Sequence, residues 1–344
     1  MRRRSFLGTL GITAGLPLMT TGSVCAEDKT DKLVRFPPPK DVQRGDMRFR
    51  KLGRTGVEIS MVGLGGFHIG KTATTDESVR IVRHAIDAGI NFMDNCWDYH
   101  NGSSEERMGK ALRDGYREKV FLMTKIDGRT KSSATKQIEE SLKRLQTDHL
   151  DLLQIHEVIR LDDADRVFAK DGAMEAIIEA QRSGKTKFIG FTGHKDPLVH
   201  LRMLEVAKKH NFAFDAVQMP LNVLDAHFRS FRNQVLPVLV KEDIGVLGMK
   251  PISAGNIVKH KLATAVECLR YAMSLPTSTV ITGMESMEML QQSLDVVKNF
   301  KLLTEAEESA ILNRTVMAAD DGRLESFKTT PQHDSTAQHP EWMG

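Results

Sequence analysis

Three short apolar segments of this chain each end in side chains that could take part in proton transfer. The segments cover residues 89–93, 120–125 and 150–156, and each is typical of a buried strand. The side chains at their ends are Asp94, Tyr99, Lys125 and His156. When parallel strands alternate with helices, all the carboxyl ends of the strands lie on one face. We therefore expect these four side chains to converge, although they are far apart in sequence.

Together the four groups could reduce a carbonyl group by acid-assisted hydride transfer. Negative charge develops on the carbonyl oxygen, so a proton donor must stand close to it. Tyr99 is the candidate donor, because the other two tyrosines of the chain fall in a loop and a helix, away from strand ends. A cation on Lys125 would favour the phenolate form of Tyr99, and Asp94 would hold that cation in place. His156 would donate a hydrogen bond to the substrate oxygen. No side chain donates hydride, so a bound cofactor must supply it.

Each residue alone also has an ordinary structural interpretation. Asp94 and Lys125 could form one structural ion pair, His156 could be a core histidine, and Tyr99 could be a loop aromatic. Their joint placement at successive strand ends favours a site, because packing gives no reason for polar groups there.

Eight strand–helix units are needed to position these residues. Strands are expected near residues 60–64, 91, 121, 152, 188, 217, 246 and 280, and helices near 77–88, 104–114, 134–145, 172–183, 198–209, 231–242, 262–273 and 287–299. This alternation is typical of an α/β fold, the (β/α)8 TIM barrel. Ser103, Ser104 and Glu105 are expected to open the second helix with N-cap chemistry. A hairpin near residues 49–59 should precede the barrel, and a polar tail from about residue 320 should wrap over its top or stay loose.

The length of 344 residues and the 40% hydrophobic content suit one barrel domain better than two small domains. We divide the chain into a signal segment (1–26), a linker (27–46), the barrel (47–302), and a C-terminal helix with a polar tail (303–344). The net charge is only +3, from 48 basic and 45 acidic residues, and no basic run is interleaved with aromatics. A nucleic-acid partner is therefore not expected.

The amino terminus resembles a twin-arginine export signal. The run Arg2-Arg3-Arg4-Ser5-Phe6-Leu7 precedes a mild apolar stretch that reaches residue 19. That stretch is short and is broken by Gly, Thr and Pro, so no stable membrane span is expected. The predicted location is the periplasm, with the twin-arginine translocation machinery as a partner. After cleavage only Cys96 and Cys268 remain, and we expect both to be free thiols.

The segment from Asp94 to Glu105 has the pattern Asp-x4-Tyr-x-x-Gly-x-Ser-Glu. Together with the strand-ending Lys125 and His156, it resembles the aldo/keto reductase family over about residues 47–300. The resemblance implies an enzyme that uses NADP or NAD to reduce an aldehyde or ketone, or to oxidise the alcohol. A sugar is one candidate among such small-molecule substrates. In the family the N-terminal hairpin closes the bottom of the barrel.

The resemblance also implies contacts to the nicotinamide end of the cofactor at Thr192, Gly193, Gln218 and Met249. Gln218 matches the family residue, whereas Thr192-Gly193 replaces a Ser-Asn pair. Met249 stands where the family commonly stacks an aromatic side chain, which suggests that a thioether packs on the ring. Lys250 could bind the pyrophosphate, or it could be a solvated charge at the end of a strand.

Further cofactor contacts are expected at Gly66, Gly283, Glu285, Ser286 and Gln292, and substrate contacts at Phe67 and Trp97. The family usually places Lys or Arg near residues 283–289 to bind the 2′-phosphate of NADP. Here Glu285 would repel that phosphate and could instead bind the ribose hydroxyls. The sequence therefore leaves NAD open beside NADP.

Two other functions remain open. A metal-dependent barrel hydrolase could use the side chains of Asp94, His156, Glu157 and His194. We disfavour it and expect no metal, because Lys125 would be unexplained and the set lacks a compact His-x-His start. The other alternative is a non-catalytic barrel that binds NADP(H) to regulate a partner.

Overall fold

Eight parallel strands form a closed barrel in the computed structural model, which describes residues 33–37 and 39–344. The strands are β4 (Val62–Leu64), β5 (Phe92–Met93), β6 (Phe121–Ile126), β7 (Leu150–Ile155), β8 (Thr186–Thr192), β9 (Ala216–Pro220), β10 (Gly245–Met249) and β11 (Thr279–Thr282). They follow one another in chain order, and β11 pairs with β4 to close the ring. The predicted (β/α)8 barrel is thus confirmed. The predicted signal segment lies outside the described residues.

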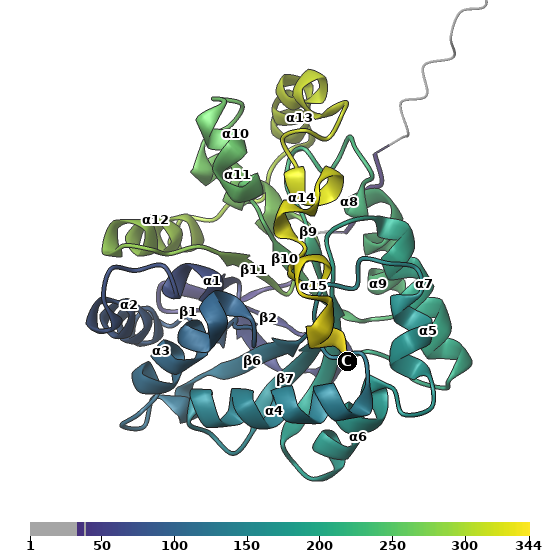
Figure 1. Cartoon of the computed structure of the whole chain (residues 1–344). Coiled ribbons are helices and arrows are strands. Elements are labelled where there is room, and N and C mark those ends of the chain that lie inside the picture. The colour runs from purple at the N-terminus through teal and green to yellow at the C-terminus, as the bar shows by residue number, and fades with distance from the viewer. Residues whose placement is uncertain (1–32, 38) are drawn as a thin grey trace, which may run out of the picture. The chain divides into compact units, whose positions relative to one another are not determined.

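Helices surround the strands (Figure 1). The main ones are α2 (Thr75–Asp87), α3 (Ser103–Ala111), α4 (Lys131–Leu145), α6 (Ala173–Arg182), α7 (Pro197–Lys209), α11 (Ala265–Ser274) and α12 (Met287–Lys298). The helix expected over residues 231–242 is instead broken into α8 (Phe231–Gln234) and α9 (Leu236–Lys241). Pro237 explains the break, because its ring clashes with the carbonyl four residues earlier in a continuous helix.

The predicted N-cap chemistry of α3 is wrong. Its N-cap is Gly102 in the left-handed conformation, and no side chain caps the helix. Ser104 instead donates to the carbonyl of Gly66 at 2.6 Å, and Glu105 accepts a hydrogen bond from Thr124 at 2.6 Å. The two side chains therefore hold α3 to β6 and to the loop after β4, which fixes the segment that carries Tyr99.

A small antiparallel sheet closes one end of the barrel. It consists of β1 (Val42–Arg44), β2 (Met47–Lys51) and β3 (Glu58–Ser60), so the predicted hairpin gains one further strand. Leu52 and Ile59 reach from it into the core and pack with Phe92, Leu152 and other residues inside the barrel. This burial of apolar side chains closes the bottom of the barrel, as the resemblance implied.

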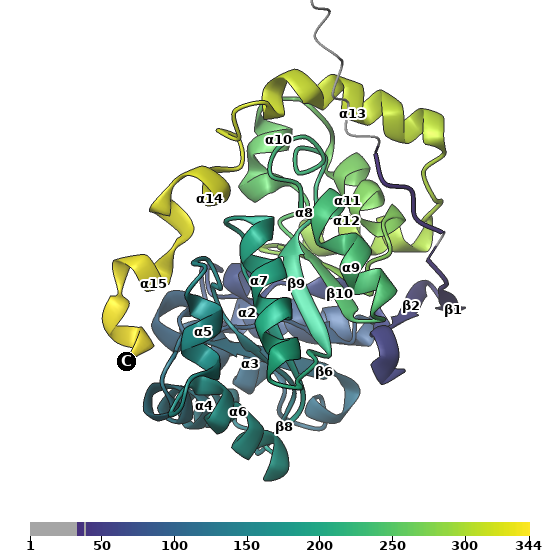
Figure 2. The same cartoon turned by 90° about the vertical axis from the view of Figure 1, so that its right-hand side faces the viewer.

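The C-terminal tail crosses the opposite end of the barrel. After α13 (Glu305–Ala319) come the short turns α14 (Ser326–Thr329), η5 (Pro331–His333), α15 (Ser335–Gln338) and η6 (Pro340–Met343). Figures 1 and 2 show this yellow segment at the end of the barrel away from β1 and β2. Lys328 pairs with Asp225 at 2.7 Å, and the carbonyl of Met343 accepts from the amide of Arg129 at 2.8 Å. The tail was expected either to wrap over the top of the barrel or to stay loose, and it wraps over the top. Among the described residues, no helix is long and apolar enough to span a bilayer.

Candidate functional site

Asp94, Tyr99 and Lys125 meet at the carboxyl ends of β5 and β6. The Lys125 ammonium donates to Asp94 Oδ1 at 2.7 Å, to the Asn95 carbonyl at 2.6 Å and to the Tyr99 hydroxyl at 3.2 Å. The backbone amide of Trp97 donates to the Lys125 carbonyl at 3.0 Å and so fixes the loop after β5 against β6. These three residues thus meet as expected, and the fourth, His156, packs against Tyr99 from the end of β7.

Tyr99 keeps its proton in this environment. Burial raises the pKa of Tyr99 well above its ordinary value, and the nearby Asp94 carboxylate raises it further. This direction is opposite to the expectation that Lys125 would favour the phenolate. The reason is that burial disfavours the charged phenolate, and the Asp94 carboxylate offsets part of the favourable effect of the Lys125 charge. A protonated Tyr99 is the form that can donate a proton to an oxygen.

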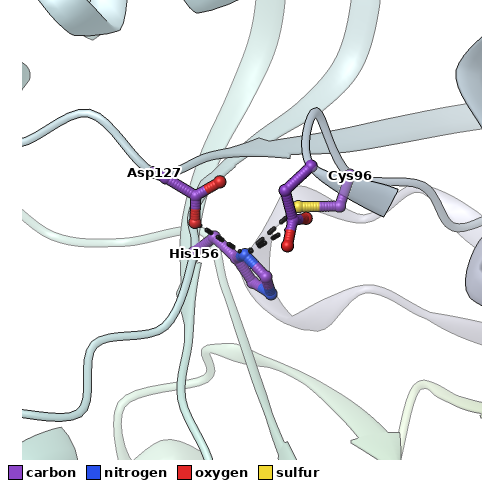
Figure 3. Close-up of side chains that lie close together, drawn as sticks. Cys96, Asp127 and His156 are labelled. Carbon is purple, nitrogen blue, oxygen red and sulfur yellow. Dashed lines mark hydrogen bonds and ion pairs between the residues drawn. The ribbon is translucent and has the colours of Figure 1, made fainter. Parts of the chain in front are cut away.

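His156 lies directly after β7 and packs edge-on against Tyr99, with ring centroids 5.9 Å apart. Its Nδ1 atom faces Asp127 Oδ1 at 2.9 Å and Cys96 Sγ at 3.2 Å (Figure 3). Asp98 Oδ1 lies 3.6 Å from the same nitrogen. Within the described part of the chain, no hydrogen-bond partner engages Nε2. Nε2 is therefore the ring nitrogen open to a substrate oxygen.

The acidic neighbours change the titration of His156. Burial on its own would lower the pKa of His156, but the carboxylates of Asp98 and Asp127 outweigh burial and raise it. Burial, followed by the Asp98 charge, raises the pKa of Asp127 to about 6. Low dielectric surroundings disfavour the charged carboxylate, which explains the direction for Asp127.

The sequence interpretation missed Asp98 and Asp127 as neighbours of His156. One signal could have found Asp127: it stands two residues after Lys125, and alternate residues of a strand point to the same side. For Asp98 no comparable periodicity exists, because it lies in an irregular loop before η2 (Tyr99–Gly102). Cys96 and Cys268 are both free and buried, as expected.

Three of the residues expected at the nicotinamide also converge. The thioether of Met249 accepts from Thr192 Oγ1 at 3.9 Å and from Gln218 Nε2 at 3.6 Å. The side-chain oxygen of Gln218 is buried without a partner among the described residues. A buried amide oxygen of this kind fits the NH2 group of a carboxamide, because buried acceptors in native proteins almost always accept a hydrogen bond. Gly193 can contact a cofactor only through its backbone. A side chain is excluded at this position, since a Cβ there would lie 2.1 Å from the Val158 carbonyl oxygen.

Lys250 follows β10 with a positive φ of 53°. Its ammonium lies over the ring of Phe327 in the tail, 5.3 Å from the ring centroid. Burial lowers the pKa of Lys250 to about 8. No carboxylate of the described residues forms a salt bridge with it. A half-buried cation without a counterion fits a phosphate better than it fits a solvated charge at a strand end.

The residues expected at the adenosine end gather around α12. Glu285 accepts a hydrogen bond from His68 Nδ1 at 2.5 Å and forms an ion pair with Lys71 at 3.5 Å. Ser286 caps α12 by accepting from the amide of Met289 at 3.2 Å. Gly283 packs against the His68 ring, and Gln292 is exposed on α12. Gly66 lies beside the active site instead, because its amide is 3.4 Å from Asp94 Oδ2. Glu285 is thus engaged by the Lys71 ammonium and by the imidazole of His68, whose pKa is lowered by burial.

The two expected substrate residues lie in different surroundings. Phe67 is 42% exposed and meets the Tyr99 ring edge-on at 5.4 Å. The indole of Trp97 instead points to α4 and the tail: its Nε1 donates to Glu140 at 2.7 Å, and its ring lies 5.3 Å from that of Trp342. Phe67 therefore lies beside the Tyr99 ring, whereas Trp97 joins the loop after β5 to the tail.

The metal set considered for a hydrolase does not assemble. Asp94 is committed to Lys125, and Glu157 accepts from the amide and hydroxyl of Thr336 in the tail at 2.8 and 2.9 Å. His194 Nε2 lies 3.0 Å from Asp334, also in the tail. These three side chains have separate partners and do not share a centre with His156.

Comparisons with known proteins agree with this geometry. The family model described as "Aldo/keto reductase family" matches residues 61–265. The uncharacterized oxidoreductase YqkF of Bacillus subtilis is 26% identical over 316 residues, which cover 78% of this chain and 97% of that protein. L-galactose dehydrogenase of Arabidopsis thaliana is 29% identical over 229 residues, covering 62% of this chain and 68% of that protein.

Among solved structures, the holo form of aldo-keto reductase AKR11C1 from Bacillus halodurans superposes with a TM-score of 0.65 at 22% identity. The match covers 78% of this chain and 96% of that one, and it shows the same fold. Because the family model spans more than half of the chain, the chain belongs to the aldo/keto reductase family and is an NAD(P)-dependent oxidoreductase.

Proposed function

We propose that this oxidoreductase reduces an aldehyde or ketone, and oxidises the corresponding alcohol, with Tyr99 as general acid and base. The observation that carries the proposal is the 3.2 Å contact between the Tyr99 hydroxyl and the Lys125 ammonium, beside the His156 ring. The Tyr99 hydroxyl and the open Nε2 of His156 can both approach one substrate oxygen. Two such donors stabilise the negative charge that develops there.

The proton is handled by Tyr99 and its neighbours. In reduction, the Tyr99 hydroxyl gives its proton to the substrate oxygen, and the Lys125 ammonium stabilises the resulting phenolate. Asp94, 2.7 Å from Lys125, keeps the amine charged and aimed at the phenol. In oxidation the same phenolate takes the alcohol proton. His156 orients the substrate oxygen through Nε2. A bound nicotinamide supplies or accepts the hydride.

The cofactor would be held by the side chains that converge across β8, β9 and β10. Thr192 and the unpartnered oxygen of Gln218 would bind the carboxamide, and the thioether of Met249 would contact the ring. Lys250 would bind the pyrophosphate. The support for these roles is the fit between unpaired polar groups and the chemistry of a dinucleotide.

We infer that the 2′-phosphate of NADP adds little affinity, so that NAD serves as a cofactor. Burial alone would raise the pKa of Glu285, but its hydrogen bond with His68 outweighs burial and lowers it. The carboxylate is therefore ionised, and it occupies the Lys71 ammonium and the His68 imidazole, whose pKa burial lowers. A phosphate placed there would meet the negative charge of Glu285, with Lys71 already paired to it.

The amino-terminal sequence and the relatives support a location and a class of substrate. Arg3-Arg4-Ser5-Phe6-Leu7 favours export by the twin-arginine machinery to the periplasm, and these residues lie outside the described ones. One relative is an L-galactose dehydrogenase, which supports a sugar as the substrate. An exported enzyme would need to retain its dinucleotide and to return it to its starting redox state within each cycle.

The decisive experiment is a single turnover of protein loaded with reduced cofactor. Aldoses and simple aldehydes are added one at a time, and the absorbance of the reduced nicotinamide is followed. We expect stoichiometric oxidation by at least one carbonyl. Tight cofactor binding without oxidation by any of them would contradict the proposal and would favour a regulatory nucleotide-binding barrel.

Cell fractionation followed by dialysis tests the export proposal separately. We expect the mature protein in the periplasm with its dinucleotide still bound after dialysis. A cytoplasmic location, or complete loss of the cofactor within minutes, would contradict it.

A further inference from the structure

Four potential metal ligands surround the Nδ1 atom of His156. They are Cys96, Asp98, Asp127 and His156 itself, and their ligand atoms all lie within 4.8 Å of one another. Figure 3 shows Cys96 and Asp127 approaching the same nitrogen of the His156 ring. The four residues come from three strand ends: the loop after β5, the residue after β6 and the residue after β7. The barrel itself therefore assembles the cluster.

The negative charge of this cluster is not balanced by the described residues. Lys125 is committed to Asp94, and Arg129 is committed to Asp163 at 3.0 Å and to backbone carbonyls. The carboxylates of Asp98 and Asp127 are 6% and 0% exposed, and His156 is the cationic group that reaches them. One imidazolium cannot balance two buried carboxylates, and buried charges without partners are costly.

Two buried carboxylate oxygens support the same conclusion independently, and one of them, Asp98 Oδ1, faces His156 Nδ1 at 3.6 Å. Asp98 Oδ1 and Asp127 Oδ2 are both buried, and neither has a hydrogen-bond partner among the described residues. Almost all buried polar atoms of native proteins are paired with protein, water or an ion. These two oxygens are therefore available to bind a ligand.

We propose that Cys96, Asp98, Asp127 and His156 Nδ1 bind one divalent metal ion of the zinc type. A thiolate, an imidazole and carboxylates form a ligand set that suits Zn²⁺ and does not suit Mg²⁺ or Ca²⁺. With metal–ligand bonds of about 2.0 to 2.3 Å, tetrahedral ligands stand roughly 3.3 to 3.7 Å apart. The three contacts around Nδ1, of 2.9, 3.2 and 3.6 Å, lie within a few tenths of an ångström of this range. The other pairs of ligand atoms, all within 4.8 Å of one another, would close by up to about 1 Å on the ion.

Binding displaces two protons to solvent, one from the Cys96 thiol and one from His156 Nδ1. The carboxylates of Asp98 and Asp127 bind in their ionised form, so the thiolate and two carboxylates together contribute three negative charges. The remaining ring proton of His156 must then sit on Nε2, the nitrogen open to the substrate. The metal thus positions a neutral donor tautomer, and it does not contact the reacting oxygen. Metal binding itself does not depend on the reaction proposed above.

Cobalt substitution of the full-length protein tests the site directly, because Co²⁺ reports a thiolate ligand in its spectrum. The protein is stripped with a chelator, titrated with Co²⁺ under anaerobic conditions, and then titrated with Zn²⁺. We expect one equivalent of cobalt, a sulfur-to-cobalt charge-transfer band, and loss of that band when Zn²⁺ displaces the cobalt. Proton release in weak buffer should accompany binding.

Matched variants separate the site from general effects on the fold. Cys96→Ser should abolish the charge-transfer band, whereas Cys268→Ser, at the other buried cysteine, should leave it unchanged. Asp127→Asn should weaken metal affinity at least tenfold. Asp98→Asn, at the least buried ligand, gives a second measurement should Asp127→Asn fail to fold. Less than a tenth of an equivalent of bound metal in folded wild-type protein would overturn the proposal, as would a charge-transfer band that persists in Cys96→Ser.

Discussion

The ammonium of Lys125 lies 2.7 Å from the carboxylate of Asp94, and the two side chains are only 1% and 4% exposed. The pair sits directly behind the Tyr99 hydroxyl, which Lys125 also contacts at 3.2 Å. A buried ion pair of this kind adds little stability by itself, but breaking it leaves one uncompensated charge in the interior. The pair therefore links the chemistry of Tyr99 to the stability of the barrel.

Tyr99→Phe should abolish carbonyl reduction and leave cofactor binding nearly intact. The change removes the proton donor and keeps the ring, so we expect a loss of about 10²- to 10⁴-fold in kcat. Cofactor affinity is measured by fluorescence titration. Tyr116→Phe is the matched control, because Tyr116 is a surface residue whose hydroxyl donates to Asp87. Near-wild-type turnover in Tyr99→Phe would remove Tyr99 from the mechanism.

Lys125→Met should lose both activity and stability. The stability loss is expected to be about 3 to 5 kcal/mol, because Asp94 is left as an unpaired buried charge. Adding Asp94→Asn should recover part of that stability and none of the activity. Chemical denaturation measures the change in stability, and kcat measures the change in activity. In the double variant with Tyr99→Phe, the activity losses should be far from additive, because the residues act as a unit. Additive losses would show that Lys125 acts independently of Tyr99.

Glu285→Gln should raise the affinity for NADP relative to NAD. Removing the carboxylate frees His68 and Lys71 to approach a 2′-phosphate, and Glu285→Arg should shift the preference further. Glu288→Gln, an exposed change three residues further on in the first turn of α12, should have no such effect. Fluorescence titration of both nucleotides measures the ratio. A hundredfold preference of the wild type for NADP, about 2.7 kcal/mol, would mean that a cation reaches the phosphate from elsewhere.

His200 should make the protein less stable as the pH falls below 6.5. Burial lowers the pKa of His200 from 6.5 to about 3, so the unfolded chain takes up a proton that the folded chain refuses. The folded state should lose about 2 kcal/mol between pH 6.5 and 5 from this group.

The His200→Phe variant isolates this contribution. Phe fills the position between the rings of Phe191 and Phe231, whose centroids lie 5.1 and 4.9 Å from that of His200. The free energy of unfolding of the variant should fall less steeply with acid than that of the wild type. His260→Gln, at an exposed histidine, is the control. Equal slopes for wild type and His200→Phe would exclude His200 as the source.

Local sequence patterns were sufficient to predict the eight strands and the convergence of Asp94, Tyr99, Lys125 and His156. Apolar runs identify strands one at a time, and the rule that parallel strand ends share a face brings their last residues together. The interruption by Pro237 was also readable from its chemistry, although the helix over residues 231–242 was predicted as continuous.

The tertiary structure alone decided which atoms face one another at the site. The sequence could not tell that Nδ1 of His156 meets Cys96, Asp98 and Asp127, nor that Glu285 is held by His68. These contacts join residues from different strand–helix units, so they depend on strand register and on the paths of irregular loops. Periodicity carries information about one element at a time. The charge around Tyr99 and His156 is set by distances between elements, and only the closed barrel fixes those distances.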